Sequence, residues 1–376
     1  MKYKLKDIFD LQMGKTPARN NRNYWNTKEN KWISIADLSK TGKYISTTKE
    51  YLSDAAVEES GIKVIPANTV VMSFKLSIGK TAITTEEMYS NEAIMAFHDR
   101  RVVDILPEYV FYMFKYRNWE EGSNKAVMGK TLNKATLSDV EIEICPIEKQ
   151  REIVAVLDKL MAVLEHREDE LQLLDKLIKA RFVEMFGDPR SNPFSFDEWM
   201  LKDTCKVITG NTPSRAVSEY YGNYVEWIKT DNIVSGLLNP TKATECLSEK
   251  GMEAGRIVER DSILMACIAG SIASIGRVCV TDRTVAFNQQ INAVVPEKYN
   301  VLFLYVLLQI SKDYLVEDVN MALKGILSKS KLEEKKFIVP PIELQNQFAD
   351  FVNQVNKSKV AVLKNYSQGG VLSYAN

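Results

Sequence analysis

The sequence is poor in the residues that usually build metal and redox sites. It has two histidines, His98 and His166, and its five cysteines are scattered without a Cys-x-x-Cys pair. Zinc sites use histidine and cysteine at short spacings, and disulfide frameworks need paired cysteines, so both are disfavoured. Ordinary buried thiols in a reducing cytoplasm fit this cysteine usage best.

The sequence also lacks net charge and long apolar runs. Its 49 basic residues balance 49 acidic ones. A nucleic-acid-binding protein needs only a basic face, so neutrality weakens that class without excluding it. There is no N-terminal signal stretch and no apolar run of about 18 residues, which disfavours secretion and membrane insertion. With 376 residues, 45% of them hydrophobic, the chain is long enough for two domains with real cores.

Motifs for catalysis are missing as well. Gly-Lys-Thr begins at Gly14, Gly79 and Gly129, but none of the three has the glycine that a P-loop places five residues earlier. The sequence contains no GxGxxG, HExxH or GxSxG motif, and no distinctive Ser/His/Asp or Cys/His set. We therefore expect no catalytic residues, no metal site and no cofactor site in this chain.

One long helical stretch, Pro146 to Phe186, organises the sequence. Pro146 and Glu148 suit the first turn of a helix, and Gly187 suits its end. At 1.5 Å per residue this helix is roughly 60 Å long, and its heptad seam requires a partner helix. A long helix buried in one globule is the alternative. The seam, in which Arg167 holds one place, comprises Ile153, Leu157, Leu160, Leu164, Leu171, Leu174 and Ile178.

A second helical run of the same kind starts at Pro340 and Pro341. Gly369 and Gly370 should end it early, so we expect it to be about half as long as the first helix. Its shortness would leave Leu171, Leu174 and Ile178 without a partner helix. Either another subunit covers them, or the chain is a truncated, recombined form with weakened assembly. The second seam comprises Phe348, Val352, Val355, Lys359 and Val362.

The chain is duplicated at an offset of 195 to 197 residues. LKDIFDLQMGKTPAR from Leu5 matches LKDTCKVITGNTPSR from Leu201, SIGKTAI matches SIGRVCV, and PIEKQREI matches PIELQNQF. Each copy mixes short β-rich runs with one helical run, Pro107–Tyr116 or Val301–Ser311, whose aromatic residues we assign to the core. Trp32 and Trp227 are also assigned to the core.

Polar residues of the duplicated turns are the candidates for DNA contact. Two similar globules on a rod can present two similar surfaces, and sites about 34 Å apart lie on one face of B-DNA. Basic and hydroxyl side chains suit phosphates, and amides suit base edges. Solvated turns, glycine hairpins and satisfied polar groups are the structural alternatives. The candidates are Lys15, Thr16, Arg19, Lys75, Ser77, Lys80, Lys130, Lys134, Thr212, Arg215, Lys229, Ser274, Arg277, Asn288, Gln289 and Lys324.

Taken together, these motifs make the chain resemble the specificity (S) subunit of type I restriction-modification systems. The duplicated Gly-x-Thr-Pro-x-Arg and Ser-Ile-Gly motifs, the two PIExQ helix starts and RFVEMFGDP carry the resemblance, which reaches to about residue 363. The resemblance implies two target recognition domains that each read one half of a bipartite DNA sequence. It implies no catalysis in this chain, and two modification (methyltransferase) subunits and ATP-dependent restriction subunits as partners. S-adenosylmethionine, ATP and Mg would belong to those partners.

The expected fold class is α+β, with two tandem mixed α/β domains separated by long helices that the resemblance pairs as an antiparallel coiled coil. The helices would set the gap between the half-sites and dock the methyltransferase subunits. The expected boundaries are 1–145 for the first recognition domain, 146–187 for the first helix, 188–199 for a connector, 200–339 for the second domain and 340–376 for the shortened second helix.

Two other functions stay open. A methyltransferase or nuclease would need a cofactor loop or a set of metal-binding carboxylates. Asn192-Pro193-Phe194 resembles the Asn-Pro-Pro-aromatic tetrad of adenine methyltransferases but lacks its second proline. A protein-binding scaffold without DNA is the third class, and specific, salt-sensitive binding to a duplex would separate it from the first.

Overall fold

The computed structural model describes residues 1–25, 27–75, 77–119, 132–317, 319 and 325–368, with side chains up to residue 363. It divides into two compact units, 1–163 and 164–376. Lys130, Lys324, Gly369 and Gly370 therefore lie outside the described residues. None of the helices in the described ranges has the length and apolar character needed to span a membrane.

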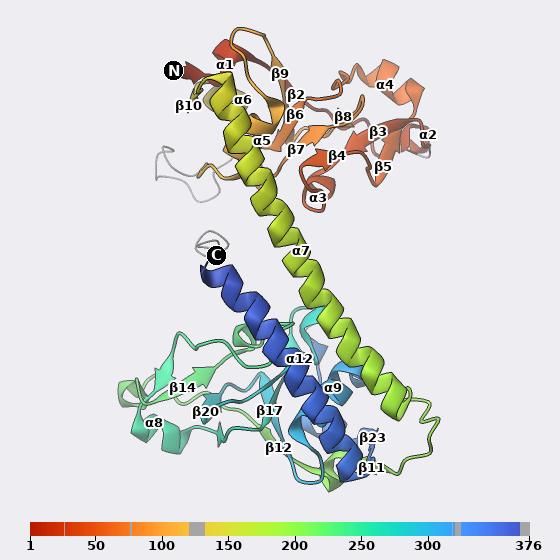
Figure 1. Cartoon of the computed structure of the whole chain (residues 1–376), viewed down its shortest axis with the longest axis vertical. Helices are drawn as coiled ribbons and strands as arrows, with labels where there is room; N and C mark the ends of the chain where they lie inside the picture. The colour runs from red at the N-terminus through yellow and green to blue at the C-terminus, as the bar shows by residue number, and fades with distance from the viewer. Residues whose placement is uncertain (26, 76, 120–131, 318, 320–324, 369–376) are drawn as a thin grey trace. The chain divides into compact units, whose positions relative to one another are not determined.

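The first unit is built on a five-stranded sheet in the order β2-β9-β6-β7-β4, whose strands are labelled in Figure 1. Its first four strands pair antiparallel, and β4 runs parallel to β7. Alternate residues of β6 enter two cores: Val70 and Met72 face the core that includes α5, and Val71 faces the other. This two-sided burial explains why the strand is continuously apolar. The strands are β2 (Phe9–Met13), β4 (Tyr44–Ile45), β6 (Val70–Ser73), β7 (Thr81–Thr84) and β9 (Ile94–Asp99).

A smaller sheet, β5-β3-β8, and a pair, β1-β10, complete the first unit. Trp32 of β3 is 2% exposed and Leu52 of β5 is fully buried, so this second sheet has its own core. The remaining elements are β1 (Lys2–Lys4), β3 (Asn30–Ile33), β5 (Glu50–Leu52), β8 (Tyr89–Ser90), β10 (Glu141–Glu143), α1 (Leu5–Ile8), α2 (Arg22–Trp25), α3 (Ile35–Leu38), α4 (Asp54–Ser60), α5 (Pro107–Lys115) and α6 (Lys134–Ser138).

The second unit repeats this plan. Its main sheet has the order β12-β21-β17-β19 and is antiparallel throughout, and a second sheet has the order β13-β15-β14-β20-β16. The pairs β11-β23 and β18-β22 stand apart from these sheets. The main strands are β12 (Cys205–Thr209), β17 (Ile263–Ala266), β19 (Val278–Val280) and β21 (Ile291–Pro296).

The other elements of the second unit are short. Serine caps explain the equivalent helices α4 and α8, because Ser53 Oγ accepts from Ala56 N and Ser248 Oγ accepts from Gly251 N. The elements are β11 (Glu198–Met200), β13 (Tyr221–Gly222), β14 (Val225–Ile228), β15 (Cys246–Leu247), β16 (Ile257–Val258), β18 (Ile268–Ala269), β20 (Val285–Phe287), β22 (Gly325–Ile326), β23 (Lys336–Ile338), η1 (Leu201–Asp203), η2 (Ser218–Tyr220), η3 (Thr230–Asn232), η4 (Ile272–Ser274), α8 (Glu249–Ala254), α9 (Val301–Ile310), α10 (Lys312–Val316) and α11 (Lys329–Glu334).

The predicted mixed α/β character of both units is confirmed, and so are the two short helices. α5 and α9 each end within one residue of the expected position. Their aromatic residues are core residues, as predicted, with Phe111, Phe114 and Phe303 at 1% exposure or less. Trp32 and Trp227, 2% and 3% exposed, also lie in the cores to which they were assigned.

The long helix α7 (Ile147–Phe186) starts within one residue of the expected position and ends at it. Its beginning is fixed to the first unit by Gln150, a fully buried residue. The Gln150 Nε2 amide donates to the carbonyls of Asp104 and Cys145, both at 2.9 Å, and Gln150 Oε1 accepts from Leu106 N at 2.9 Å. Buried polar groups need such partners, so this glutamine sets the position of the helix on the domain.

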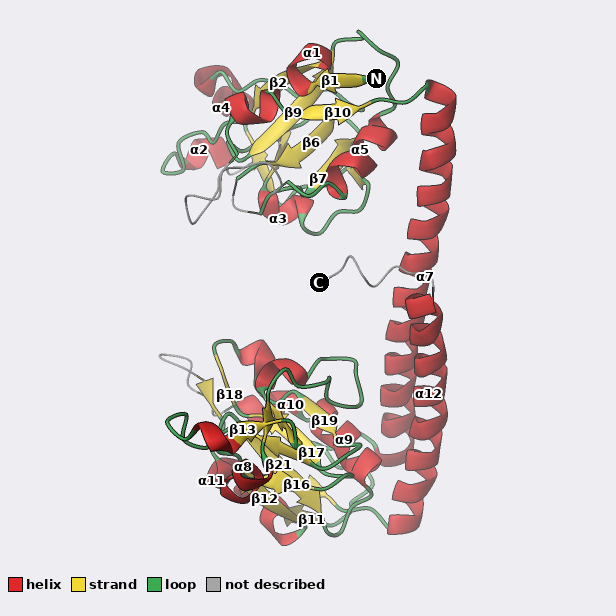
Figure 2. Ribbon diagram, turned by 90° about the vertical axis from the view of Figure 1, so that its left-hand side faces the viewer, coloured by secondary structure: helices red, strands yellow, loops and turns green. Residues whose placement is uncertain are grey.

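The second half of α7 packs against α12 (Ile342–Gln368), and the two helices lie side by side (Figure 1, Figure 2). Asp175 of α7 forms an ion pair with Lys359 of α12, and Phe186 contacts Phe348 with 5.6 Å between ring centroids. From the first contact to the second, the residue number increases by 11 along α7, from 175 to 186, and decreases by 11 along α12, from 359 to 348. The two helices are therefore antiparallel within the second unit.

The expectation that the end of the first seam lacks a partner is wrong. Ile178 is 6% exposed, and Leu174 packs against the same core as Val352 and Val355 of α12. These residues are covered because the two helices are antiparallel, so that the beginning of α12 packs against the end of α7. α12 has 27 residues against 40 in α7, so it is shorter than α7 but longer than half of it.

Nearer the start of α7, the buried face differs from the predicted seam. Val154, Leu157 and Met161 pack against the core of the first unit, whereas Leu160 is 39% exposed. The helix buries a different stripe here because it packs on a domain rather than on a second helix. The other seam residues, Ile153, Leu164 and Leu171, are half-buried, and Val362 is 5% exposed.

We predict that Phe348→Ala lowers the free energy of unfolding of the second unit by about 3–5 kcal/mol, because it leaves a cavity among packed rings. Phe348 is fully buried and contacts Phe182, Phe186 and Phe303. Urea denaturation followed by circular dichroism measures the change. Phe194→Ala, at a residue that is 53% exposed, is the control, and an equal loss in both variants would contradict this packing.

Candidate nucleic-acid interface

Segments that are far apart in the sequence meet at one end of each main sheet. In the first unit, Met13 at the end of β2 pairs with Met95, and Ser73 at the end of β6 pairs with Ile94, both near the start of β9. In the second unit, β12 and β17 end beside the start of β21 in the same way. We call these ends the loop ends. They are formed by residues 14–19, 74–75, 77–80 and 91–93 in the first unit, and by 210–215, 267–277 and 288–290 in the second.

A glycine allows the first loop of each loop end to lie against the backbone of the third. A Cβ on Gly14 would lie 2.2 Å from the carbonyl oxygen of Asn91, and one on Gly210 would lie 2.2 Å from that of Asn288. Such distances exclude any side chain. The loops are also joined by backbone hydrogen bonds, from Gly14 N to Ile94 O at 3.1 Å and from Gly210 to the equivalent isoleucine at 3.0 Å.

The threonine of the motif ties the same two loops through side chains. The hydroxyl of Thr16 donates to Glu92 Oε2, and the hydroxyl of Thr212 donates to Gln289 Oε1 at the equivalent place. The hydrogen bond from Thr16 is the main cause that lowers the pKa of Glu92, and the nearby charge of Lys75 lowers it further. Lys75 thus lies in the same cluster as Thr16.

Each motif arginine is held by a glutamate and an aromatic ring. Arg19 forms a bidentate pair with Glu50, with nitrogen–oxygen distances of 2.5 and 3.2 Å, and its guanidinium lies 3.8 Å from the ring centroid of Trp25. Bidentate pairing and stacking both suit the planar guanidinium.

The second unit repeats the arrangement. Arg215 bonds Glu245 at 2.8 and 3.4 Å and lies 4.5 Å from the ring centroid of Tyr221. Lys229 reaches the same carboxylate at 2.8 Å. These bonds, first that from Arg215 and then that from Lys229, lower the pKa of Glu245 to about 2.

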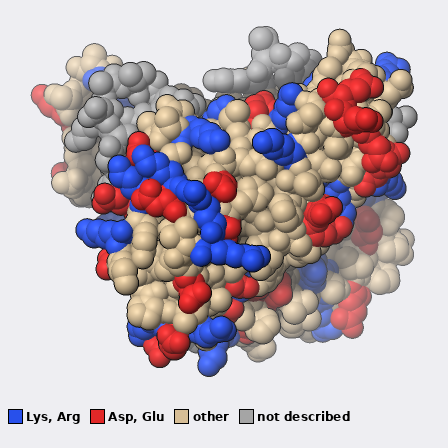
Figure 3. Space-filling model, turned by 90° about the horizontal axis from the view of Figure 1, so that it is seen from above, with Lys and Arg blue, Asp and Glu red and all other residues tan. Residues whose placement is uncertain are grey.

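Arg19 and Arg215 are thus each held by partners within their own loop end, although their side chains are exposed. Phosphate contact by either arginine would require the glutamate to be displaced or shared. Acidic side chains likewise lie among the basic ones on the face of the molecule that Figure 3 shows. A surface of this kind accounts for the neutral composition of the chain.

The predicted core tryptophans support the loops. Trp32 Nε1 donates to the carbonyl of Lys15 at 3.1 Å, and Trp227 Nε1 donates to that of Asn211 at 3.3 Å. The Lys15 side chain is exposed, and its ammonium group donates to the carbonyl of Ser60. Lys15 is thus a cation at the surface of the loop end with a backbone partner.

The Ser-Ile-Gly turns lie at the same ends. In the first unit Ser77 is exposed, and the backbone N–H of half-exposed Lys80 donates to Ser73 Oγ at 3.1 Å. In the second unit the Ser274 hydroxyl lies 3.0 Å from that of Ser271, and Arg277 donates to the carbonyls of Ser274 and Thr230, both at 3.3 Å.

The remaining candidates separate into distinct environments. Asn288 is 6% exposed and bonds Gln290 through both ends of its amide, which is the arrangement of a satisfied turn residue. Gln289 beside it is exposed. Lys134 begins α6, which packs against α1, the helix that leads into β2, so it lies away from Gly14.

Sequence reasoning missed the acidic residues Glu50, Glu92 and Glu245. A signal for two of them was present, because Glu50 and Glu245 match at the offset of the duplication. Within the described ranges of the chain, no three His, Cys, Asp or Glu side chains gather to hold a metal ion. The loop ends combine cations, hydroxyls and amides, which are groups for binding.

We predict that Arg215→Ala raises the pKa of Glu245 from about 2 toward its ordinary value of 4.5. A lowered pKa means that the stabilisation is present above about pH 4.5 and is lost as the pH falls toward 2. Carboxyl chemical shifts followed by NMR measure the change. Arg260→Ala, which removes a partner of Asp261 instead, is the control and should leave Glu245 unchanged.

Comparison with known proteins identifies both halves of the chain. The family described as the type I restriction modification DNA specificity domain matches residues 1–174 and again 195–368. The MjaIX type I restriction enzyme specificity subunit of Methanocaldococcus jannaschii is 24% identical over 402 residues, covering 96% of this chain and 89% of that protein. The HindI specificity subunit of Haemophilus influenzae is 29% identical over 175 residues, 41% of this chain and 37% of that protein.

Solved structures share the fold. The S subunit of the type I restriction-modification system of M. genitalium aligns with a TM-score of 0.55 at 15% identity, covering 99% of this chain and 93% of that one. A chain from a study of complex assembly in the type I R-M system aligns with the same TM-score at 17% identity, covering 98% and 93%. The chain therefore belongs to the family of type I restriction-modification DNA specificity subunits, and it carries two copies of the specificity domain.

Proposed function

We propose that each unit of this specificity subunit reads one half of a bipartite DNA target. The duplicated loop end is the observation that carries the proposal. The glycine, threonine and arginine of the motif and the core tryptophan that supports it recur in equivalent contacts in both units, so each unit presents one similarly built surface. Two half-sites and an unread gap follow from two such surfaces in one chain.

The proposed contacts divide by chemistry. Exposed or half-exposed cations such as Lys15, Lys75 and Lys80 would contact phosphates, and the exposed amide of Gln289 would contact a base edge. Two cations of the loop ends, Arg19 and Arg215, are already paired with glutamates. The isolated chain should therefore bind DNA weakly and depend on salt.

The partners supply the chemistry in this proposal. Two modification subunits with S-adenosylmethionine would methylate adenine, and restriction subunits with ATP and Mg would translocate and cut. The chain itself would hold no cofactor and would work in the cytoplasm. The relatives named as specificity subunits of type I restriction enzymes support this division. The helices α7 and α12 would dock the modification subunits and set the gap between half-sites.

Co-expression with the modification subunit, followed by sequencing of methylated adenines, tests the function. We expect one split motif with a single fixed gap, because one chain carries both readers. A continuous motif, or methylation by this chain without its partner, would overturn the proposal.

We also predict that Lys15→Ala with Lys75→Ala weakens binding of the complex to all duplexes. Loss of two phosphate contacts should reduce the slope of log affinity against log salt by about 2. Filter binding over a salt series measures the slope. Lys202→Ala with Lys206→Ala, two exposed lysines at the opposite end of β12 from the loop end, is the matched control, and an equal change in both variants would argue against the loop end.

A further inference from the structure

The two units differ where the main sheet approaches the long helix. In the first unit two bridges cross this place. Lys43 Nζ lies 2.5 Å from Asp158 Oδ1 of α7, and the Tyr44 hydroxyl donates to Glu108 Oε1 of α5 at 2.9 Å. The Tyr112 hydroxyl also donates to Asp158. The side chain of Lys43 thus fills the space and neutralises the carboxylate.

Backbone hydrogen bonds identify the equivalent sheet residues in the second unit. Ile83 N donates to Lys43 O at 2.9 Å, and Val280 N donates to Leu238 O at 2.7 Å. Since Ile83 and Val280 occupy equivalent strands, β7 and β19, Leu238 takes the place of Lys43. Asn239 then takes the place of Tyr44.

The two buried glutamines, Gln150 and Gln345, show which residues of α7 and α12 are equivalent. Gln345 of α12 accepts from Asn300 N at 2.9 Å and donates to Pro340 O at 2.8 Å, as Gln150 does in the first unit. Asp158 lies eight residues after Gln150, so its counterpart is Asn353. Glu108 lies two residues after the N-cap of α5, so its counterpart is Leu302. The counterparts of the Lys43–Asp158 bridge are therefore Leu238 and Asn353, and those of the Tyr44–Glu108 bridge are Asn239 and Leu302. Neither pair forms a bridge in the part of the second unit that the structure describes.

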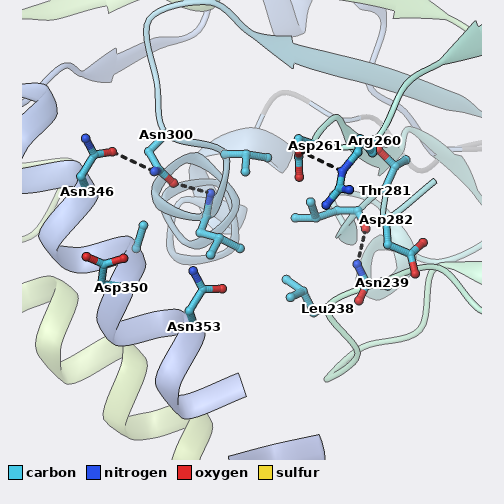
Figure 4. Close-up of a pocket in the computed structure, with 14 residues that line it drawn as sticks. Leu238, Asn239, Arg260, Asp261, Thr281, Asp282, Asn300, Asn346, Asp350 and Asn353 are labelled. Atoms are coloured by element: carbon cyan, nitrogen blue, oxygen red, sulfur yellow. Dashed lines mark hydrogen bonds and ion pairs between the residues drawn. The ribbon is translucent and has the colours of Figure 1, made fainter. Parts of the chain in front are cut away.

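A cavity of about 480 Å³ occupies this place (Figure 4). All four counterparts, Leu238, Asn239, Leu302 and Asn353, line it. Substitution of the two bridges has thus left an open site between the sheet and α12 within the second unit.

The lining has one apolar wall and several acceptors. Leu238, Val301, Leu302 and Ala349 supply apolar surface. The side chains of Asp350 and Asn353 have no hydrogen bond or ion pair with another residue that the structure describes, and Asn353 comes from the next turn of α12. Of the three aspartates in the lining, Asp261 is paired with Arg260 and Asp282 with Arg283. Among the described residues Asp350 is the lining carboxylate without an ion pair, so the cavity disfavours a phosphate and favours a cation near Asp350.

We propose that this cavity receives a lysine or arginine side chain of the modification subunit. Its aliphatic stem would lie along Leu238 and Leu302, and its charged head would bond Asp350 and Asn353. An incoming side chain would thus take the role that Lys43 plays in the first unit. The inference rests on the proposed function, since it names a contact between this chain and the modification subunit.

Filling the cavity tests the proposal. Asn353→Lys places a cation in it, and Gln354→Lys makes the same charge change at the neighbouring exposed position of α12. Leu238→Lys with Asn353→Asp rebuilds the bridge of the first unit and should fold with an unchanged or higher melting temperature. We expect both cavity variants of the full chain to bind the modification subunit at least about tenfold more weakly, with Gln354→Lys within about twofold of wild type.

The outcomes separate this inference from the function on which it rests. If wild type binds the modification subunit and the cavity variants bind equally well, the cavity is not the contact, although the proposed function stands. Equal loss in Gln354→Lys, or a change confined to DNA affinity, would also overturn the inference. If wild type does not bind the modification subunit at all, the proposed function fails and takes this inference with it.

Discussion

The packing of one helix into two cores is the constraint on which the rest of this structure depends. The first half of α7 contributes Val154 and Leu157 to the core of the first unit, and its second half contributes Phe182 and Phe186 to the core of the second. A helix that is part of both cores cannot leave either domain without unfolding it. α12 then closes the second core through Phe348. The long helix is therefore a structural element of both domains as well as a link between them.

A second constraint acts at the loop ends, where polar groups satisfy each other before any ligand arrives. The glycine brings two backbones together, the threonine joins the loops, and the arginine is held between a carboxylate and an aromatic ring. Such an arrangement leaves the fold of the loop end independent of the residues beside it. A neighbouring position such as Lys15, whose counterpart in the second unit is Asn211, is then free to differ between the two units, which suits domains that read different sequences.

The sequence allowed prediction wherever the determining signal is local or repeated. The limits of α7 follow from its caps and its periodicity, and the duplication follows from a steady offset. Other features depend on partners that the local pattern does not name. Glu50 can reach Arg19 because its strand β5 pairs with β3. Leu160 is exposed because α7 packs on a domain, and not on a second helix, at that point. The cavity of the second unit lies where the counterparts of both the Lys43–Asp158 and the Tyr44–Glu108 bridges are missing, and neither substitution alone would predict a site from the sequence.

The central claim is that each unit carries its own reader of one half-site. Replacing residues 1–145 with the equivalent residues 196–340 gives a chain with two copies of the second reader, and the adenines methylated by its complex can be mapped by sequencing. The account predicts a target in which the sequence of the second half-site occurs twice and that of the first is gone. Persistence of the first half-site would contradict the account.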